Sequence, residues 1–218
     1  MNENRIFEMS RAGVLPDTTA DCTDRIGAVL AENEENVTYL FEKGVYRFHA
    51  SNGLIREYSL SNTDGAQYER TLSLLIKDRK NITIDGGGAT FVFYGHLQPF
   101  TIDGCENITL KNLVIDWEKP LVSEVEIVGR SADFIDVRIN QNLFPCRVRD
   151  YSMYFDIGDG EESELTYGDH TIYNPDTLKV TPRSSDIVKV KSVEALSDDA
   201  FRLYTDDILP PGSPPRVG

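Results

Sequence analysis

Asn81-Ile82-Thr83-Ile84-Asp85-Gly86 and Asn107-Ile108-Thr109-Leu110-Lys111-Asn112 are two versions of one hexapeptide, 26 residues apart. Each copy is flanked by short β-branched runs and by turn residues. A repeat of this length that contains only strands and turns excludes a helical repeat. It is typical of successive coils of a parallel β-solenoid, in which each coil stacks on the previous one. The repeat therefore predicts a parallel β-helix, a fold that often carries enzymes and binders of polysaccharides.

Each predicted coil consists of three strands separated by turns. The strands of the first coil are residues 72–76, 81–84 and 91–93, and those of the second are residues 100–102, 108–110 and 113–115. Gly86-Gly87-Gly88 is predicted to form a tight corner that needs a positive φ. Aligning the last strands of the two coils places Phe91 over Leu113 and Phe93 over Ile115, as inward stacks.

A helix is predicted over residues 18–33, ahead of the repeats. Its candidate N-caps are Thr18, Thr19 and Asp21, and its apolar stripe consists of Ile26, Val29 and Leu30. We expect this helix to cap the solenoid, because an exposed first coil would leave sheet edges bare. Strands are predicted over residues 37–41 and 45–48. Residues 51–70 are polar and are expected to be irregular, with Tyr58 and Leu60 as anchors.

The pattern changes after Lys119-Pro120. Ile135, Val137 and Ile139 alternate with charged residues, and similar alternation recurs over residues 188–191 and 201–204. Period-two alternation is typical of half-buried antiparallel strands. The predicted class is all-β: residues 1–120 hold an N-terminal cap and the first coils of a right-handed parallel β-helix, and residues 121–218 form an antiparallel β-barrel or sandwich. Residues 209–218 are expected to be a loop, and so short a solenoid to be the front part of a longer one.

The amino-acid composition limits the classes of molecule that the protein is expected to bind. The chain has 218 residues, is 40% hydrophobic and carries a formal net charge of −14 at pH 7. Such acidity disfavours nucleic acid and anionic membranes, which attract clustered Lys and Arg, and leaves neutral sugars compatible. Cys22, Cys105 and Cys146 are odd in number and lack Cys-x-x-Cys spacing, so we expect reduced thiols and no zinc site. The N-terminus lacks a signal-peptide pattern, which leaves open a cytoplasmic protein or a secreted one whose signal is absent.

Five motifs between Tyr39 and Pro120 resemble the opening region of glycoside hydrolase family 110. They are Phe41-x-x-Gly44-x-Tyr46, Arg56-Glu57-Tyr58-x-x-Ser61-Asn62, Asn81-Ile82-Thr83-Ile84-Asp85-Gly86-x-Gly88, Phe93-x-Gly95-x-x-x-Pro99-Phe100 and Leu110-Lys111-Asn112-x-x-Ile115-Asp116-Trp117. The third motif and the start of the last occur in many β-helix proteins. The blocks at Arg56 and at Ile115-Asp116-Trp117 are narrower.

This resemblance implies an exo-acting, inverting α-galactosidase that releases terminal α-1,3-linked galactose. It also implies a small β-barrel that interrupts the β-helix, in agreement with the change at Pro120. The catalytic carboxylates of the family are expected on later coils, beyond Gly218, so that this chain alone would be inactive. The implied partner is a carbohydrate with terminal galactose, and no cofactor is expected.

Asp116-Trp117-Glu118 is the best local candidate for sugar contact. Residues i and i+2 of a strand face the same way, so Asp116 and Glu118 are predicted to point outward together. The alignment of the coils places Tyr94 beside Asp116 and His96 beside Glu118, and Trp117 leans inward or swings out before Pro120. Paired carboxylates are also what glycoside hydrolysis needs. The alternative is that Trp117 seals a domain junction and that the charges are merely solvated.

Other polar residues have structural alternatives. Arg56 is a candidate for ligand contact or for an ion pair that holds its loop. His49 and His170 have no partner at metal spacing, and the acidic residues 156–164 are expected to form a solvated turn rather than a calcium loop. Asn-x-Thr tripeptides begin at Asn36, Asn81 and Asn107. We expect Asn81 and Asn107 to stack at a corner rather than to carry glycans.

Three functions remain open from the sequence. The favoured one is a glycosidase acting on terminal α-galactose. The second is a polysaccharide lyase on the same fold, although the two readable coils show no cluster of three carboxylates for calcium. The third is a non-catalytic carbohydrate-binding module or adhesin, whose repeats would usually be longer and more regular.

Overall fold

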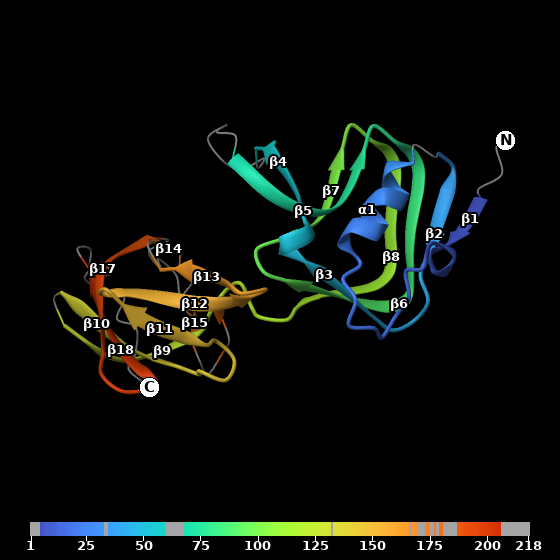
Figure 1. The fold of residues 1–218 in the computed structure, drawn as a ribbon. Coiled ribbons are helices and arrows are strands. Elements are labelled where there is room, and N and C mark those ends of the chain that lie inside the picture. Colours follow the sequence, from blue (N-terminus) through green and yellow to red (C-terminus); the bar gives the residue numbers. More distant parts are fainter. Residues whose placement is uncertain are drawn as a thin grey trace. The chain divides into compact units, whose positions relative to one another are not determined.

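The computed structural model describes residues 5–32, 35–59, 68–131, 133–165, 167–169, 173–174, 177, 179–180 and 187–205. The chain forms two compact units (Figure 1): unit 1 contains Met1–Lys119 and Ile157–Glu161, and unit 2 contains Pro120–Asp156 and Glu162–Gly218. The fold is mostly β, with parallel pairing in unit 1 apart from one antiparallel hairpin, and antiparallel pairing in unit 2. Some residues used above lie outside the described ranges: Leu60, Ser61, Asn62, His170 and residues 209–218.

The larger sheet of unit 1 is parallel throughout. It contains β1 (Arg5–Glu8), β2 (Val37–Leu40), β6 (Lys80–Tyr94), β3 (Val45–His49) and β8 (Glu106–Trp117). The first half of β6 pairs with β2 and its second half with β3, while β8 pairs with both halves of β6. The predicted strands 81–84 and 91–93 are therefore parts of one long strand, and so are 108–110 and 113–115.

A second sheet of unit 1 contains β4 (Leu54–Tyr58), β5 (Tyr68–Lys77) and β7 (Gln98–Asp103). The second half of β5 pairs in parallel with β7, and its first half pairs antiparallel with β4. The prediction that residues 51–70 are irregular is therefore wrong for both arms of this hairpin. The segment looked irregular because its side chains are polar, yet its backbone hydrogen bonds are made across the β4–β5 ladder.

The core of unit 1 is rich in aromatic side chains. Phe48, Phe91 and Phe93 are completely buried, and the Phe41 and Phe91 ring centroids lie 4.9 Å apart. The 3-10 helices η1 (Met9–Ala12) and η2 (Ala50–Asn52) flank this core. Buried aromatic pairs of this kind contribute about 0.5–1.5 kcal/mol beyond the burial of their area.

The predicted helix is shorter than expected. Helix α1 spans Thr23–Ala31, and its apolar stripe of Ile26, Val29 and Leu30 is buried as predicted. Residues 17–22 are not helical because their backbone bonds to β3: Asp17 N donates to Val45 O, and Cys22 N donates to Arg47 O. The N-cap of the helix is Cys22, so none of the three candidate N-caps occupies that position. Asp21, the residue before it, accepts a hydrogen bond from Thr23 N at 2.9 Å.

The asparagines of the repeat form a ladder, which confirms that Asn81 and Asn107 stack. Asn107 Nδ2 donates to Asn81 Oδ1 at 2.7 Å, and Asn81 Nδ2 donates to Asn36 Oδ1 at 2.9 Å. All three residues have φ near +57°, the left-handed region that Asn tolerates better than most residues. The amides bond to one another rather than to backbone groups, so Asn36 is a third rung of this Asn ladder.

The glycine corner accounts for an error in the predicted alignment. Gly87 and Gly88 have the expected positive φ, and a Cβ on Gly86 would lie 2.5 Å from Leu113 Cβ. The ladder between β6 and β8 shifts register between Asp85 and Ala89. The partners beyond the corner are Phe91 with Ile115 and Phe93 with Trp117. The predicted stacks are therefore wrong by two residues, because the corner of β8 is shorter than that of β6.

Unit 2 is built from antiparallel strands. Its five-stranded sheet has the order β14 (Tyr167–Asp169), β17 (Ile187–Ala195), β18 (Ala200–Thr205), β10 (Phe134–Ile139), β9 (Val125–Arg130). The remaining strands are β11 (Cys146–Arg149), β12 (Ser152–Gly158), β13 (Glu161–Glu164), β15 (Tyr173–Asn174) and β16 (Lys179–Val180). Val137 and Ile139 are buried, as their alternation predicted, and they pack with Met153, Val193 and Phe201.

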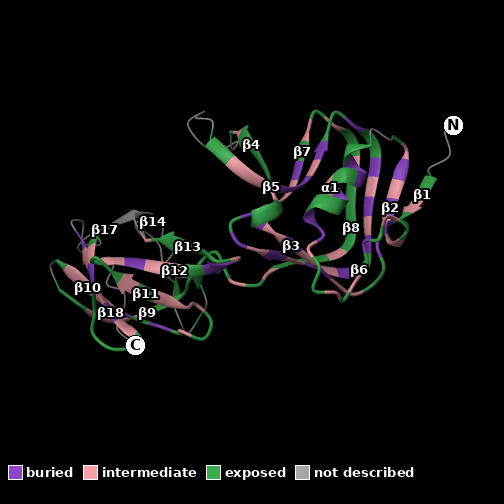
Figure 2. Cartoon of the chain, in the orientation of Figure 1, coloured by how far each residue is buried: buried purple, intermediate pink, exposed green. Residues whose placement is uncertain are grey.

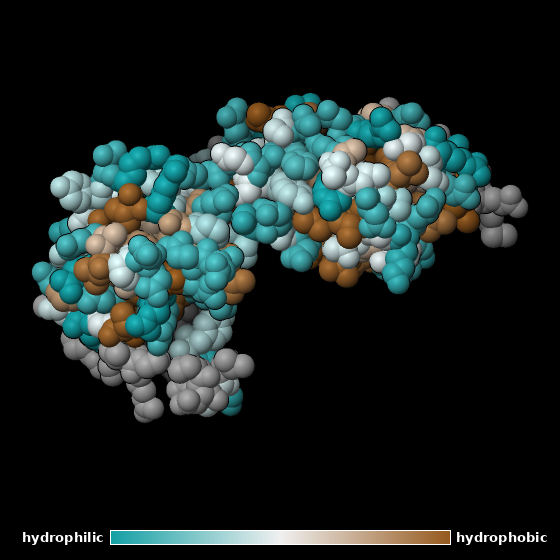
Figure 3. Space-filling view, turned by 60° about the horizontal axis from the view of Figure 1, so that its bottom comes forward, coloured by the Kyte–Doolittle hydropathy of each residue, from teal (hydrophilic) through white to brown (hydrophobic). Residues whose placement is uncertain are grey.

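Strand β8 has no buried residue and is mostly exposed, as its green colour in Figure 2 shows. Val114 is 55% exposed, and Ile102 on β7 is 48% exposed. Brown apolar atoms reach the surface of both units in Figure 3. Within the described ranges, no helix is long and apolar enough to cross a membrane.

Candidate functional site

Three neighbouring parallel strands of unit 1, β3, β6 and β8, end at the same edge of the sheet. Their last inward residues are Phe48, Phe93 and Trp117. The centroids of the Phe48 and Phe93 rings lie 4.8 Å apart, and those of Phe93 and Trp117 lie 5.7 Å apart. This buried aromatic row supports the polar residues that follow it on the opposite face.

His49 and Tyr94 are the polar residues that end β3 and β6, and they are register partners. Their rings are stacked, with centroids 4.3 Å apart and planes 9° apart. His49 Nδ1 lies 2.7 Å from Asp159 Oδ1. We call His49, Tyr94 and Asp159 the strand-end cluster.

Asp159 orients the cluster. Its Oδ2 accepts a hydrogen bond from Ser51 N at 2.8 Å, and its side chain is only 12% exposed. Burial by itself raises the pKa of Asp159, but hydrogen bonds from His49 and Ser51 outweigh that effect and hold the pKa below its ordinary value. The charged carboxylate therefore fixes the His49 ring and leaves Nε2 as the ring nitrogen facing away from Asp159.

Asp159 lies in the turn Ile157–Glu161, which belongs to unit 1. Its three central residues all have positive φ. Gly95 N donates to Ile157 O at 3.2 Å, and His96 N donates to Glu161 Oε2 at 3.0 Å. The turn is therefore bonded to the bend after β6, and it is not the merely solvated acidic turn that the sequence suggested.

Gly95 allows this close packing. Its φ is +81°, and a Cβ at this position would lie 2.9 Å from Ala50 Cβ and 3.2 Å from Asp159 Cβ. Any other residue would be strained in its backbone and crowded by both neighbours. Gly95 is thus required by the geometry that holds Asp159 beside His49.

The structure revises the predicted arrangement around Asp116-Trp117-Glu118. Asp116 pairs with Val92, not with Tyr94, because of the register shift at the glycine corner. Glu118 N donates to Phe93 O at 2.9 Å, which places Glu118 at the end of β6. His96 lies beyond that end, so its predicted position beside Glu118 in the ladder is also wrong.

The three side chains of Asp116-Trp117-Glu118 differ in how far they are exposed for contact with a ligand. Trp117 leans inward, one of the two orientations predicted, and its ring packs against Phe93. Asp116 is exposed, and its Oδ1 accepts a hydrogen bond from Trp117 N at 2.9 Å. Glu118 is exposed and forms a 3.7 Å ion pair with Lys119. The two carboxylates face solvent, and the tryptophan does not offer a free stacking surface.

Arg56 lies on β4, away from the strand-end cluster in the second sheet. Its Nη1 donates to the carbonyl oxygen of Ile55 at 2.7 Å. Among the residues that the structure describes, no carboxylate forms an ion pair with Arg56, so the predicted ion pair that would hold its loop is not seen there. The structure thus brings Tyr94, His96 and Glu118 to one edge of unit 1 and leaves Arg56 elsewhere.

The described ranges contain neither a metal-binding cluster nor a disulfide. No group of three or more His, Cys, Asp or Glu side chains there is placed to hold a metal ion. Cys22, Cys105 and Cys146 are free thiols. Burial raises the pKa of Cys22 and of Cys146, which disfavours the thiolate form that reacts.

Sequence reasoning missed the strand-end cluster because His49 and Asp159 are 110 residues apart in the chain. Gly158-Asp159-Gly160 is typical of a tight turn, but the motif does not indicate that the turn contacts His49. In the sequence His49 is isolated, because it has no partner at metal spacing.

Comparison with known proteins agrees with this architecture. Residues 123–218 match the family described as GLAA-B beta-barrel domain I. Alpha-1,3-galactosidase B of Bacteroides thetaiotaomicron is 29% identical over 194 residues, which cover 88% of this chain and 31% of the relative. Alpha-1,3-galactosidase B of Phocaeicola vulgatus is 28% identical over 96% of this chain and 36% of its own length.

A third relative extends the comparison to another type of the enzyme. Alpha-1,3-galactosidase A of B. thetaiotaomicron is 34% identical over 108 residues, which cover 48% of this chain and 19% of the relative. The chain spans about a third of the length of the galactosidase B relatives described above. It is therefore distantly homologous to alpha-1,3-galactosidases over most of its length, and its residues 123–218 match the GLAA-B beta-barrel domain I family.

Proposed function

We propose that this chain is part of a family 110 glycoside hydrolase that releases terminal α-1,3-linked galactose from a glycan. The observation that carries the proposal is the homology to alpha-1,3-galactosidases across 88% and 96% of the chain. The block from Arg56 to Trp117, which resembles the same family, supports it independently of the barrel match at residues 123–218.

The same proposal extends to the architecture. Unit 1 is the beginning of a right-handed parallel β-helix, and residues 121–218 are a barrel inserted into it. The parallel ladder of β2, β6 and β8 and the Asn ladder support the first statement. The return of Ile157–Glu161 to unit 1 supports the second statement, because the chain leaves unit 1 after Lys119 and contributes to it again later.

In this proposal the edge of the sheet at which β3, β6 and β8 end contributes substrate contacts rather than the reacting acids. Inversion needs an acid and a base carboxyl about 6.5–9.5 Å apart, with a water between them and the sugar. We assign those two carboxyls to the part of the enzyme that corresponds to the remaining two thirds of the relatives, outside the region matched by this chain. Tyr94, His96, Asp116 and Glu118 are proposed to bind sugar hydroxyls, and Trp117 supports them from the core.

Galactose release is the direct test. The 218-residue chain and the full product of the native gene are incubated with α-1,3-linked and α-1,6-linked galactobiose, and proton NMR identifies the first anomer released. We expect the full product to release β-galactose from the α-1,3-linked disaccharide and the 218 residues alone to release none. Failure of the full product on every α-galactoside refutes the proposal.

The alternative functions are outcomes of the same experiment. Cleavage of uronic-acid polymers that increases with calcium would identify a lyase. Tight glycan binding without turnover would identify a binding module. Robust galactose release by the 218 residues would instead direct attention to Asp116 and Glu118 as the reacting pair.

A further inference from the structure

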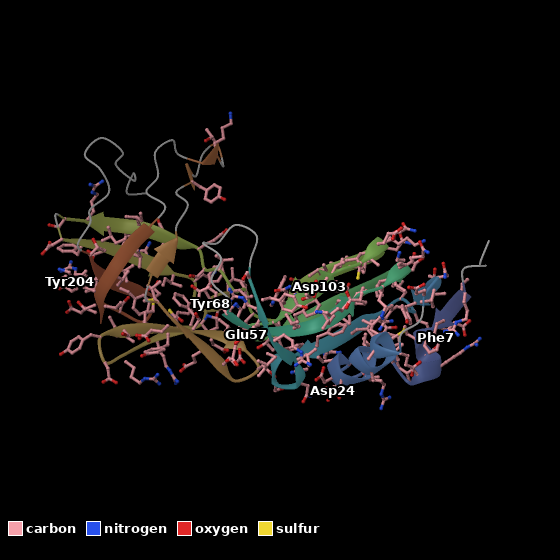
Figure 4. The ribbon with its side chains drawn as sticks, turned by 90° about the horizontal axis from the view of Figure 1, so that it is seen from above. Phe7, Asp24, Glu57, Tyr68, Asp103 and Tyr204 are labelled. Carbon is pink, nitrogen blue, oxygen red and sulfur yellow. The ribbon has the colours of Figure 1, made fainter. Side chains whose placement is uncertain are left out.

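The hairpin of β4 and β5 pairs identical residues. Its ladder joins Arg56 to Arg70, Glu57 to Glu69 and Tyr58 to Tyr68. Figure 4 shows two of these residues, Glu57 and Tyr68, close together on the hairpin. Side chains directly opposite one another in an antiparallel pair are near neighbours, so two arginines and two glutamates are each placed beside a like charge.

Alternation separates these pairs into two faces. Arg56 and Tyr58 lie on one face of β4, and their partners Arg70 and Tyr68 lie on the same face of β5. The Arg70 guanidinium lies 5.3 Å from the centroid of the Tyr68 ring. We call these four residues the Arg–Tyr face. Since the glutamates occupy the opposite face, they do not neutralise the two arginines.

Neither arginine has a charged partner in the described ranges. Arg56 donates to the Ile55 carbonyl, and Arg70 Nε is buried without a hydrogen-bond acceptor. This occurs in a chain with 36 acidic residues. Facing like charges and an unsatisfied buried donor both destabilise a folded hairpin. A bound oxyanion would supply the charged partner that both guanidinium groups lack among the described residues.

The Arg–Tyr face is anchored at its edge. Tyr58 Oη donates to Asp103 Oδ2 at 2.9 Å, and Lys77 Nζ lies 2.8 Å from the same oxygen. One carboxylate oxygen of Asp103 is therefore shared by Tyr58 and Lys77, and Asp103 forms no ion pair with either arginine among the described residues. Tyr68, in contrast, is 49% exposed and presents its ring to solvent beside Arg70. The Arg–Tyr face thus combines a tyrosine held in place by Asp103, two guanidinium groups and one exposed aromatic ring.

We infer that Arg56 and Arg70 form a clamp for an oxyanion carried by a sugar, either a sulfate ester or a carboxylate, with Tyr68 as the ring against which that sugar packs. Arginine suits this role because its planar fork matches sulfate and carboxylate oxygens and forms strong charge-assisted bonds. The inference rests on the proposed function only in naming a glycan as the carrier. It adds an acidic sugar to the substrate class, which the net charge of the chain alone does not suggest.

Binding is measured on the 218-residue chain by NMR of the arginine Nε–Hε groups during titration with sodium sulfate, galactose 6-sulfate, galacturonate and neutral galactose at constant ionic strength. We expect sulfate and at least one acidic sugar to shift the Arg56 and Arg70 signals, and neutral galactose to leave them unchanged. Arg56→Gln and Arg70→Gln should each weaken binding about tenfold or more. Arg11→Gln, an exposed arginine paired with Glu8, is the control with the same charge change and should stay within about twofold of the unmodified chain.

A second measurement separates the clamp from a structural role. Without ligand, Arg56→Gln should leave thermal stability equal or higher, because it removes a like-charge neighbour. Unchanged arginine signals with every anion, or equal weakening by Arg11→Gln, overturns the clamp. Binding of free sulfate without either acidic sugar overturns the glycan assignment. Because these measurements do not involve galactose release, loss of the proposed enzymatic function would leave their result standing.

Discussion

The Asn ladder predicts how replacement of its middle rung changes the stability of unit 1. Asn81→Ala removes two side-chain hydrogen bonds, at 2.9 and 2.7 Å, at a position with φ +56°. Two such bonds contribute about 1–3 kcal/mol, and a left-handed alanine costs about 1 kcal/mol. The expected loss in the free energy of unfolding is therefore about 2–4 kcal/mol, toward the lower end because these amides are exposed.

Two matched variants separate the contributions. Asn81→Gly loses the same hydrogen bonds but adopts a positive φ without strain, so it should be less destabilised than Asn81→Ala by about 1 kcal/mol. Asn107→Ala removes the last rung, which has φ +57° but only one ladder bond among the described residues. Its loss should be smaller than that of Asn81→Ala by roughly one hydrogen bond, about 0.5–1.5 kcal/mol.

Urea unfolding monitored by fluorescence suits this experiment. Trp117 is the single tryptophan, and it packs in the core of unit 1, so its emission reports on that unit. The reasoning is refuted if Asn81→Ala unfolds within about 0.5 kcal/mol of the unmodified chain, or if Asn81→Gly is the less stable of the two. The first outcome would show that the ladder does not stabilise the repeat, and the second that the positive φ does not set the difference between the two variants.

Further predictions concern the turn that packs beside β6. Gly95→Ala should lose about 2–3 kcal/mol in the free energy of unfolding, because φ is +81° and the added Cβ would crowd Ala50. Gly27→Ala is the control, because Gly27 lies on α1 with open space where its Cβ would be. It should instead gain about 0.5–1 kcal/mol in the same urea assay. Asp159→Asn should lose about 1–3 kcal/mol at pH 7, since it weakens the bonds from His49 and Ser51. The folded pKa of Asp159 is lowered, so its contribution is present above the unfolded pKa of about 3.9 and is lost as pH falls through the folded value. The stability gap between the unmodified chain and Asp159→Asn should accordingly close below about pH 4, and a gap that persists at lower pH would contradict this account.

The strand pattern could be predicted from particular residues. The two Asn-Ile-Thr copies predicted parallel stacking, and the structure pairs Ile82 with Ile108 in a parallel ladder. The alternation at Val137 and Ile139 predicted an antiparallel sheet with those residues inside. Both patterns succeed because side-chain period and β-branching are local properties that reflect which face of a strand is buried.

Contacts of long sequence separation were less predictable. The number of residues at a corner sets the register beyond it, and one strand alone does not reveal how its neighbour turns. The alignment at Phe91 and Phe93 therefore failed by two residues, and the neighbours assigned to Asp116 and Glu118 failed with it. Helix α1 began later than its pattern suggested because residues 17–22 found backbone partners on β3.

Local sequence patterns are enough to indicate that this protein is built from strands, that its first part repeats in parallel and that its second part is antiparallel. Those properties follow from hydrophobic period, β-branched residues and turn glycines, all of which act locally. The contact of Asp159 with His49 and the pairing of Arg56 with Arg70 are visible only in the folded chain. Such meetings depend on corner lengths and on where a turn returns to the fold, which are fixed by packing over the whole chain rather than by any single segment.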